Sequence, residues 1–436
     1  MSDAADLGVA AAAGALRSGA LQAKTLTDAC LRRIEARNPA LHAFVAVTAT
    51  EARAMAADSA QRLIGGAARS PLEGVPIALK DNIDQRGVAS TNGLAHGPVA
   101  LRDARVVERL RAAGAVLVGK LNMHECALGA TNRNPHWGDA QNPLRPGYTP
   151  GGSSGGAAVA VAACLVPAAL GTDTMGSVRL PAAYCGVVGF KPSFGRLSTD
   201  GVLPLSPALD HVGALARSVE DVALVFAALD EAPQAALPSP PAALRLGLLA
   251  NARSVRCEPA ALEAFRRALA RLRASGVAVA TFELDDFDPE AVRRAGLLVV
   301  EAEGAEALAA RGSAWSLPSA PVVAMLEYGR RLAPERLAQA REAVRRCGEA
   351  FAALAARVDA IVSLTAPQCA FPFEADEPAN QASLCAPANF AGAPSISLPI
   401  AVGVDLPYGL LLTAAPGRDA ALLAVARRVE ALLGGA

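Results

Sequence analysis

The sequence predicts an α/β fold built as one large domain. Two observations carry this prediction. Amphipathic helical segments alternate along the chain with short apolar strands. The 436 residues, of which 52% are hydrophobic and 19% charged, also suffice to bury a large core. We therefore predict a mixed, mostly parallel central sheet covered by helices on both faces. One domain would span residues 1–436, with a helical segment at about 1–60, a core at about 65–225 and a C-terminal part of the same sheet at about 244–436.

The first clear element is an amphipathic helix in residues 26–47, which read LTDACLRRIEARNPALHAFVAV. The residue before a proline is disfavoured in the helical region of backbone space. The helix is therefore predicted to end at Asn38-Pro39, with an extended segment after it.

Two segments share a pattern of helix, glycine stop and buried strand. They are residues 103–122 (DARVVERLRAAGAVLVGKLN) and 257–284 (CEPAALEAFRRALARLRASGVAVATFEL). Further apolar runs indicate strands, and a terminal helix follows the last of them. The strands are expected at 244–251, 359–367, 395–400 and 408–415, and the helix at 417–433.

Between Arg145 and Asp173 the chain carries no charge over 27 residues. The run contains three prolines and many small residues, so it does not suit an apolar membrane helix. We expect it to be buried in protein. The Ala- and Pro-rich stretch at 229–245 is interpreted as a surface loop inside one domain rather than a domain linker, because strands precede and follow it at similar spacing.

Composition argues against several classes of partner. Lysine and arginine total 41, as do aspartate and glutamate, so no net charge favours nucleic acid or an anionic membrane surface. Eight cysteines are scattered without a C-x-x-C pair, and the start MSDAADLG lacks the features of a signal peptide. We expect reduced thiols in a cytoplasmic protein.

A glycine-serine loop precedes an alanine-rich helix at PGGSSGGAAVAVAAC, residues 150–164. The amides at such a helix start favour an anion or a developing negative charge. No lysine follows the glycines, which disfavours a nucleotide phosphate loop. Residues 152–156 also fit G-x-S-x-G, a pattern that would make Ser154 the nucleophile of an α/β-hydrolase.

A serine nucleophile needs a base, and the histidines supply none that is convincing. Asp210-His211 is the obvious place for an acid and a histidine, but adjacent side chains point in different directions. His124-Glu125 does not continue to H-E-x-x-H, so the metalloprotease helix is absent. The other histidines, at positions 42, 96 and 136, offer nothing better.

Lysine can serve as the base when burial keeps it neutral. Lys80 ends the apolar run PLEGVPIALK, where such desolvation is expected. The alternative interpretation pairs Lys80 with Asp81 or Asp84 at the end of a strand. Lys191 competes for the role, although the proline after it favours a structural turn.

Three motifs occur in order that together resemble the amidase signature family of serine hydrolases. They are GVPIALKDNI at 74–83, PGGSSGGAAVAVAA at 150–163 and ALGTDTMGSVRLPAAYCGVVGFKPSFGRLS at 169–198. Weaker similarity extends over nearly the whole chain. The resemblance implies the amidase signature fold and a Ser-cis-Ser-Lys mechanism.

Matching the motifs residue by residue implies that Ser177 is the nucleophile, Ser153 the bridging serine and Lys80 the base. Ser153 precedes Ser177 by 24 residues, the separation typical of the family. The peptide bond between Gly152 and Ser153 is then expected to be cis, and Ser154 is reduced to a supporting role. No cofactor or metal is implied.

The resemblance also implies an oxyanion hole formed by the backbone amides of Thr174, Met175, Gly176 and Ser177. The family commonly has two glycines before the nucleophile, whereas this chain has Met175-Gly176. Methionine costs little at negative φ and roughly 1 kcal/mol or more at positive φ. We predict an intact hole with Met175 facing the substrate channel or the neighbouring scaffold.

Asp173 and Arg179 flank this turn. An ion pair that fixes the loop is favoured over direct contact with substrate, because buried pairs beside a nucleophile commonly organise it.

The implied function is an amidase that hydrolyses the C–N bond of a carboxamide to a carboxylate plus ammonia or an amine, through an acyl-enzyme. A glutamine-hydrolysing A subunit of an aminoacyl-tRNA amidotransferase-like complex and a non-catalytic binding or scaffold homologue are the alternatives. A small-molecule amide is the expected partner, and a homodimer is the default oligomer. Loops at 123–137, 313–330 and 367–389 are expected to shape the substrate pocket.

Overall fold

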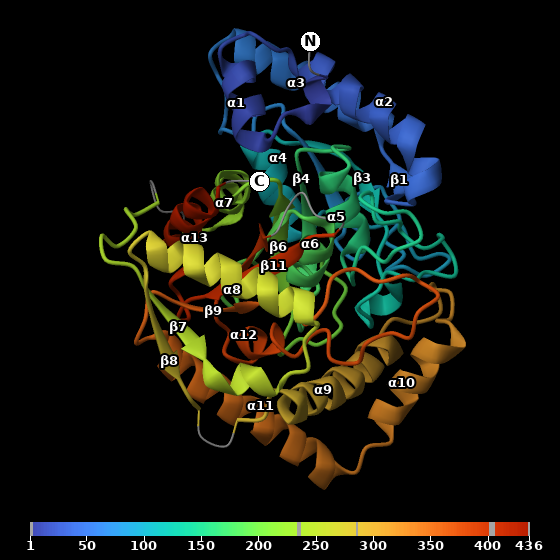
Figure 1. Cartoon of the computed structure of the whole chain (residues 1–436). Helices are drawn as coiled ribbons and strands as arrows, with labels where there is room; N and C mark the ends of the chain where they lie inside the picture. The colour runs from blue at the N-terminus through green and yellow to red at the C-terminus, as the bar shows by residue number, and fades with distance from the viewer. Residues whose placement is uncertain (1–2, 233–236, 285–286, 401–405, 435–436) are drawn as a thin grey trace.

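An eleven-stranded mixed sheet runs through the molecule (Figure 1). The structure is a computed structural model that describes residues 3–232, 237–284, 287–400 and 406–434. In spatial order the strands are β1 (Phe44–Val47), β3 (Val116–Leu121), β2 (Pro76–Lys80), β4 (Ala168–Asp173), β6 (His211–Ala216), β5 (Val188–Lys191), β10 (Ser395–Ile400), β11 (Tyr408–Thr413), β9 (Ala360–Leu364), β7 (Arg245–Leu249) and β8 (Ala278–Phe282).

The mixed sheet is confirmed, but its parallel share is smaller than the sequence predicted. In the described residues β2 pairs in parallel with β3 and β4, and β7 with β8 and β9. The other six pairings are antiparallel. One reason is connection length: β10 and β11 are joined through residues 401–407, too few for the crossover that parallel neighbours need.

The N-terminal helices α1 (Val9–Arg17), α2 (Ala23–Leu41) and α3 (Ala49–Ile64) form one end of the molecule (Figure 1). The predicted end of α2 at Asn38-Pro39 is wrong, because the helix continues through Pro39 to Leu41. The His42 N–H donates to the Asn38 carbonyl oxygen at 2.8 Å, and buried Leu41 packs into the core. Packing of Leu41 thus outweighs the local preference of the residue before proline.

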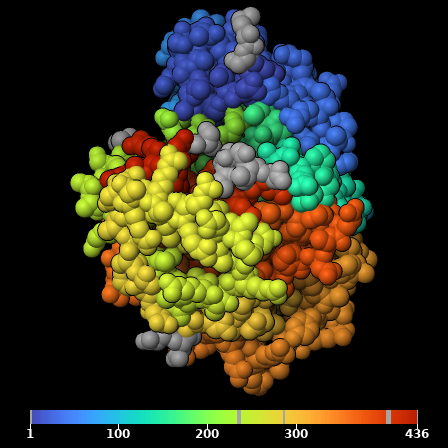
Figure 2. All heavy atoms as spheres, viewed as in Figure 1, coloured from blue at the N-terminus to red at the C-terminus, as the bar shows by residue number. Residues whose placement is uncertain are grey.

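Helices pack around the sheet, as predicted. Those of the signature region are α4 (Arg105–Ala113), α5 (Gly155–Ala162), α6 (Arg179–Cys185) and α7 (Val219–Leu229). Those that follow are α8 (Pro259–Ala274), α9 (Pro289–Ala309), α10 (Ala320–Arg330), α11 (Pro334–Ala355), α12 (Ala386–Phe390) and α13 (Asp419–Leu433). Short 3₁₀ turns occupy Ala4–Asp6, Glu125–Ala127 and Ala250–Ser254. Helix α8 crosses one face in yellow, and α9 to α11 lie at the end opposite the N-terminal helices (Figures 1 and 2).

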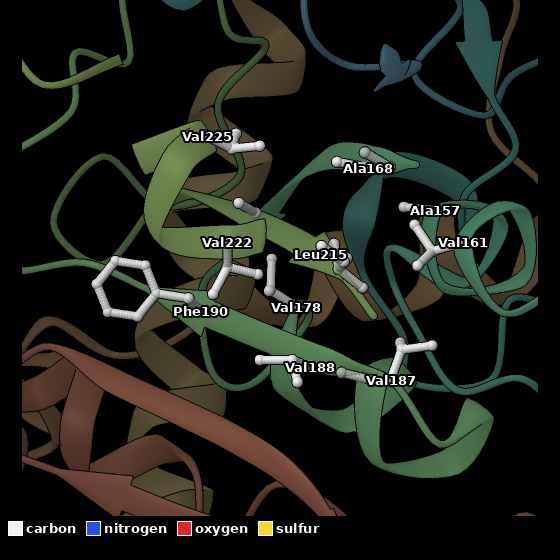
Figure 3. Packing of buried hydrophobic residues seen from close by; sticks show 14 of the residues in the cluster. Ala157, Val161, Ala168, Val178, Val187, Val188, Phe190, Leu215, Val222 and Val225 are labelled. Carbon is white, nitrogen blue, oxygen red and sulfur yellow. The ribbon is translucent and has the colours of Figure 1, made fainter. Parts of the chain in front are cut away.

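The core centres on the strands of the signature region. Figure 3 shows Val222 of α7 and Val161 of α5 gathered with Leu215 around β4, β5 and β6. The charge-free run is buried there, as predicted, from Thr149 through Val161. Gly156 is required in it, because a β-carbon would lie 2.4 Å from the Asn122 carbonyl oxygen. The small residues of α5 thus let the preceding loop, which carries Ser153 and Ser154, approach the sheet closely.

Other sequence expectations can be placed on the fold. The two helix–glycine–strand segments are confirmed as α4 with β3 and α8 with β8, and the strands and helix expected after residue 244 are β7, β9, β10, β11 and α13. All eight cysteines are unpaired. The stretch 229–245 lies partly outside the described residues, at 233–236, while β6 before it and β7 after it belong to one sheet. Within the described ranges, no helix combines the length and apolar character needed to cross a bilayer.

Candidate active site

Lys80 ends β2 with its side chain fully buried. Its Nζ donates to Ser153 Oγ at 2.7 Å and to Thr172 Oγ1 at 2.8 Å. Strand β4, which carries Thr172, runs parallel to β2, so the carboxyl ends of both strands meet at one edge of the sheet. The parallel pairing therefore brings the predicted base to the predicted bridging serine.

Asp81 does not pair with Lys80, contrary to the alternative interpretation of this strand end. Successive residues of an extended chain point to opposite sides, and Asp81 lies 3.4 Å from Lys120 Nζ. In the described part of the chain no carboxylate comes within ion-pairing distance of Lys80. Burial lowers the pKa of Lys80 to about 7, although the charges of Asp210 and Asp173 act to raise it. A large fraction of Lys80 is therefore neutral near pH 7.

Lys191, the competing lysine, has a structural role. Its Nζ donates to the carbonyl oxygens of Ala393 at 2.7 Å and Pro192 at 3.0 Å. Burial and the nearby Arg179 charge hold its pKa well below the usual range. These contacts join the end of β5 to the segment before β10. They agree with the structural role that the proline after Lys191 favoured.

The two serines of the glycine-rich loop face different partners. The Gly152–Ser153 peptide bond is cis, as the resemblance implied, and Ser153 Oγ accepts from Lys80. Ser154 is buried, and its Oγ donates to the Thr172 carbonyl oxygen at 3.1 Å. Its N–H donates to the Ser177 carbonyl oxygen at 3.1 Å. Ser154 thus joins the loop to β4 and to the turn that follows it, rather than facing a cavity.

Ser177 lies between β4 and α6 and is half-buried at the surface of a cavity. The described residues contain no hydrogen bond between the Ser153 and Ser177 hydroxyls. The backbone link from Ser154 to Ser177 nevertheless fixes the two segments side by side.

Asp173 and Arg179 form a fully buried ion pair, as the sequence predicted. Arg179 Nη2 lies 2.9 Å from Asp173 Oδ1, and Nε lies 3.0 Å from Oδ2. The same carboxylate accepts the N–H of Gly176 at 2.8 Å and of Val178 at 3.0 Å. The charge of Arg179 and its hydrogen bonds to the carboxylate keep the pKa of Asp173 below its usual range despite burial. The pair therefore shapes the turn around Ser177.

One of the four amides predicted to form the oxyanion hole is not available, because the Gly176 N–H donates to the Asp173 carboxylate. Gly176 also carries the positive φ of the turn, at 134°, whereas Met175 does not adopt one. Across residues 173–179 the N–H groups of Thr174, Met175 and Ser177 donate to no acceptor in the described protein. These three remain available, so the methionine in place of a glycine removes no donor.

Asp210 has a role that the sequence did not reveal. It accepts from Thr174 Oγ1 at 2.6 Å and from the amides of Leu205 and Ser206. Burial raises its pKa to about 6. Its neighbour His211 is buried with Nδ1 2.7 Å from the Leu209 carbonyl oxygen, so it is not poised as a base for Ser154. Asp210 instead fixes Thr174, the first residue of the predicted oxyanion turn at 174–177.

Asn389, on α12, was also missed because no sequence motif surrounds it. Its Nδ2 donates to the Asp173 carboxylate at 2.9 Å, and its Oδ1 accepts from Arg179 Nη2 at 2.6 Å. Thr172 lies inside a recognised motif, but only the fold shows that its Oγ1 holds Lys80. Both contacts depend on residues far apart in the sequence.

A cavity of about 340 Å³ opens over Ser177. The three segments predicted to shape the pocket all contribute to it, through residues 127–130, Met325, 377–379 and 381–382, but Met325 lies on helix α10 rather than in the predicted loop. One face of α9 was not foreseen and adds Arg293, Leu297 and Val300. Met175 lines the same cavity, and a β-carbon on Gly296 of α9 would lie 3.1 Å from its Cε. Met175 thus faces both the cavity and the scaffold, as predicted.

No group of three or more histidine, cysteine, aspartate or glutamate side chains is arranged to hold a metal ion in the described ranges. His136 instead contacts Glu125 at 3.0 Å. His124 Nδ1 lies 3.4 Å from Thr131 Oγ1, and burial lowers the pKa of this histidine to about 4.

The geometry can be compared with known proteins. The Amidase family model matches residues 25–423. The A subunit of the glutamyl-tRNA(Gln) amidotransferase of Anaeromyxobacter sp. (strain K) is 50% identical over 222 residues, which cover 50% of this chain and 45% of that protein. The indoleacetamide hydrolase of Pseudomonas savastanoi is 44% identical over 237 residues, covering 54% of this chain and 50% of that protein. The matched regions span about half the length of these relatives.

The likeness to solved structures is wider. A crystal structure of an amidase superposes with a TM-score of 0.90 at 32% identity, covering 98% of this chain and 100% of that one.

Proposed function

Because the chain belongs to the amidase family, we propose that it hydrolyses the C–N bond of a carboxamide through an acyl-enzyme on Ser177. The observation that carries the proposal is the buried Lys80, which has no ion-pair partner in the described residues and lies 2.7 Å from Ser153 Oγ. Burial lowers the pKa of Lys80 to about 7, so it is able to accept a proton at neutral pH.

The proposed reaction begins with proton transfer. Neutral Lys80 takes the proton of Ser153, and Ser153 takes that of Ser177 as the Ser177 oxygen attacks the amide carbonyl. Thr172 holds the lysine in place, because its Oγ1 accepts from Lys80 Nζ at 2.8 Å. The relay then returns the proton to the leaving amine, and water attacks the acyl-enzyme by the same route.

Charge that develops on the carbonyl oxygen needs donors. We assign this role to the free amides of Thr174, Met175 and Ser177, with Gly176 reserved for Asp173. Asp173, Arg179, Asn389 and Asp210 are positioning residues, because each contacts the turn or its ion pair rather than the cavity opening.

The test is Ser177→Ala assayed on a panel of small aliphatic amides, aryl amides and glutamine. We expect kcat/KM to fall by at least about 10⁴-fold, as for other nucleophile deletions. Ser177 makes no side-chain hydrogen bond in the described structure, so the far-UV circular dichroism and Tm should be unchanged. Full hydrolysis by Ser177→Ala would overturn the proposal, and labelling of wild type by a serine-directed fluorophosphonate gives an independent readout.

The 50% identity to an amidotransferase A subunit favours a second candidate, a component that releases ammonia from glutamine for a partner. The chemistry at Ser177 would be the same. Co-purification of partner subunits, together with glutamine hydrolysis that depends on them, would support this candidate. Hydrolysis of other amides by the isolated chain at an equal or higher rate would exclude it.

A further inference from the structure

One face of α9 forms a wall of the cavity that holds Ser177. Arg293, Leu297 and Val300 line it, and they are spaced i, i+4, i+7. Residues at this spacing share one face of a helix. Gly296, at i+3, approaches Met175 on the oxyanion turn. Arg293 therefore belongs to the same wall as the residues that lie against the proposed chemistry.

The guanidinium of Arg293 is hydrogen-bonded through Nε, whereas its two Nη atoms have no protein partner in the described residues. Its side chain is only 12% exposed, and Nε lies 3.3 Å from Glu290 Oε2. Glu290 is itself fixed, since its Oε1 accepts from Ser383 Oγ at 2.6 Å. Within the described residues neither Nη1 nor Nη2 of Arg293 has a protein acceptor, neither is fully buried, and Arg293 is one of the residues that line the cavity. A bidentate donor pair is thus left unused.

The rest of the cavity surface is mostly apolar. Its other large side chains are Leu128, Met175, Leu180, Leu205, Leu297, Val300 and Met325. Apolar walls lower the local dielectric constant and strengthen the attraction between Arg293 and an anionic group. The other charged lining residue, Glu377, is exposed and accepts from Gln381 Nε2 at 3.0 Å. Glu377 would repel an anion, whereas Arg293 would bind it.

We propose that Arg293 determines specificity and that the preferred substrates are small linear amides with a carboxylate at the end away from the scissile bond. The proposal rests on the amidase function proposed above. Two parallel N–H···O bonds from the guanidinium to the carboxylate match the planar geometry that arginine favours. The apolar side chains would hold the methylene chain between the carboxylate and the amide.

The test compares each ω-carboxy amide with the diamide of equal length, over chains of two to five methylenes. The two compounds differ only at one end, which carries a carboxylate in one and a neutral amide in the other. Because the diamide has two reactive ends, its rate is divided by a statistical factor of about two. For the best length we expect wild-type kcat/KM to favour the carboxylate by at least about tenfold, since hydrogen bonds to charged groups are worth about 1.5–3 kcal/mol.

Arg293→Met removes the charge and keeps a long apolar side chain, so it should abolish this preference while diamide hydrolysis persists. Arg293→Lys keeps the positive charge but not the planar guanidinium, so its preference for the carboxylate should lie between those of wild type and Arg293→Met. Arg294→Met is the matched control, because Arg294 is the exposed neighbour on the same helix. Glu377→Gln should retain or increase the preference. An unchanged ratio in Arg293→Met would overturn the assignment.

Binding separates this inference from the proposed chemistry. The Ser177→Ala protein should bind the aliphatic dicarboxylate of the best length, measured by calorimetry, and the Ser177→Ala/Arg293→Met protein should bind it at least about tenfold more weakly. If wild type hydrolyses no amide yet this difference holds, the proposed function fails and the anion site stands. If Ser177→Ala binds no dicarboxylate of any tested length, the inference about Arg293 fails.

Discussion

The α9 wall of the cavity differs from the buried polar network beside Ser177, which we call the floor although its residues do not line the cavity themselves. In the floor Lys80, Ser153, Asp173 and Arg179 are fully buried, and most of their polar atoms are hydrogen-bonded to protein partners. In the wall Arg293 and Leu297 are partly exposed and Val300 is buried, and the cation Arg293 makes a single hydrogen bond to protein within the described residues.

The two regions therefore differ in how well they tolerate amino-acid substitutions. A buried polar network is costly to disturb, because each partner that is removed leaves another group unsatisfied. An apolar, half-buried wall tolerates substitution at a lower cost. In the proposed function the floor carries the reaction, and the wall is free to select the substrate.

The largest effect is expected from Lys80→Met, which removes the proposed base from the floor and keeps most of the volume of the lysine side chain. Loss of a general base typically costs about 10²–10⁴-fold, so kcat/KM should fall by about 10³-fold or more. Ser153→Ala should lose a comparable amount. The double variant should be little worse than either single one, because the residues act as a unit. Steady-state kinetics check this, and full activity in Lys80→Met would refute the assigned base.

The next effect concerns the stability of the floor. Asp173→Ala leaves Arg179 charged and buried without its partner, which should lower the free energy of unfolding by about 3–5 kcal/mol. Urea denaturation measures the change. Glu342→Ala is the matched control, because its pair with Arg345 is exposed to solvent and its loss should leave the free energy of unfolding nearly unchanged. Equal losses in the two variants would show that the buried pair of the floor is no more costly to break than an exposed ion pair.

Much of the floor could be predicted because its residues fall in short contiguous motifs. Lys80, Ser153 and Ser177 were assigned from such motifs, and the structure places Lys80 against Ser153. The engagement of the Gly176 amide could not be foreseen, since it depends on where the Asp173 carboxylate points after Arg179 and Asn389 have bound it.

The wall was less predictable. Arg293 is separated from Ser177 by more than a hundred residues, and nothing in its local sequence marks it as part of a cavity. The alternation of helices and strands predicted the α/β class of the sheet. The order of the strands could not be predicted, because it depends on packing between residues far apart in the sequence. The helix through Pro39 was mispredicted for a similar reason, since burial of Leu41 overrides a local preference.

The third prediction uses pH to examine the floor. Only neutral Lys80 accepts a proton, and burial lowers its pKa to about 7. For uncharged amides kcat/KM should therefore be flat above this pH and fall about tenfold per pH unit below it. A profile without this acid limb near pH 7 would contradict the assignment of Lys80.

The variant Asp210→Asn tests whether the acid limb of the pH profile belongs to Lys80. The charge of Asp210 acts to raise the pKa of Lys80, so its removal should lower that pKa and move the acid limb to lower pH. Asp200→Asn, at an exposed carboxylate paired with Arg102, should leave the profile in place. An unmoved limb in Asp210→Asn would mean that Asp210 acts only through its hydrogen bond to Thr174.

The smallest effect is expected at Met175, where the floor meets the wall. Met175→Ala keeps the backbone N–H and removes a side chain that lines the cavity near Gly296. The chemistry should be preserved, with kcat within about threefold of wild type, KM for short aliphatic amides changed by less than about tenfold, and a loss of about 1 kcal/mol in stability. Met325→Ala is the matched control, because it removes a methionine from the same cavity without touching the oxyanion turn. Similar shifts of KM in the two variants would assign Met175 to the wall. A fall in kcat of about 100-fold in Met175→Ala alone would instead show that its side chain holds the amides of the turn in place, and the division between floor and wall would then have to move to include it.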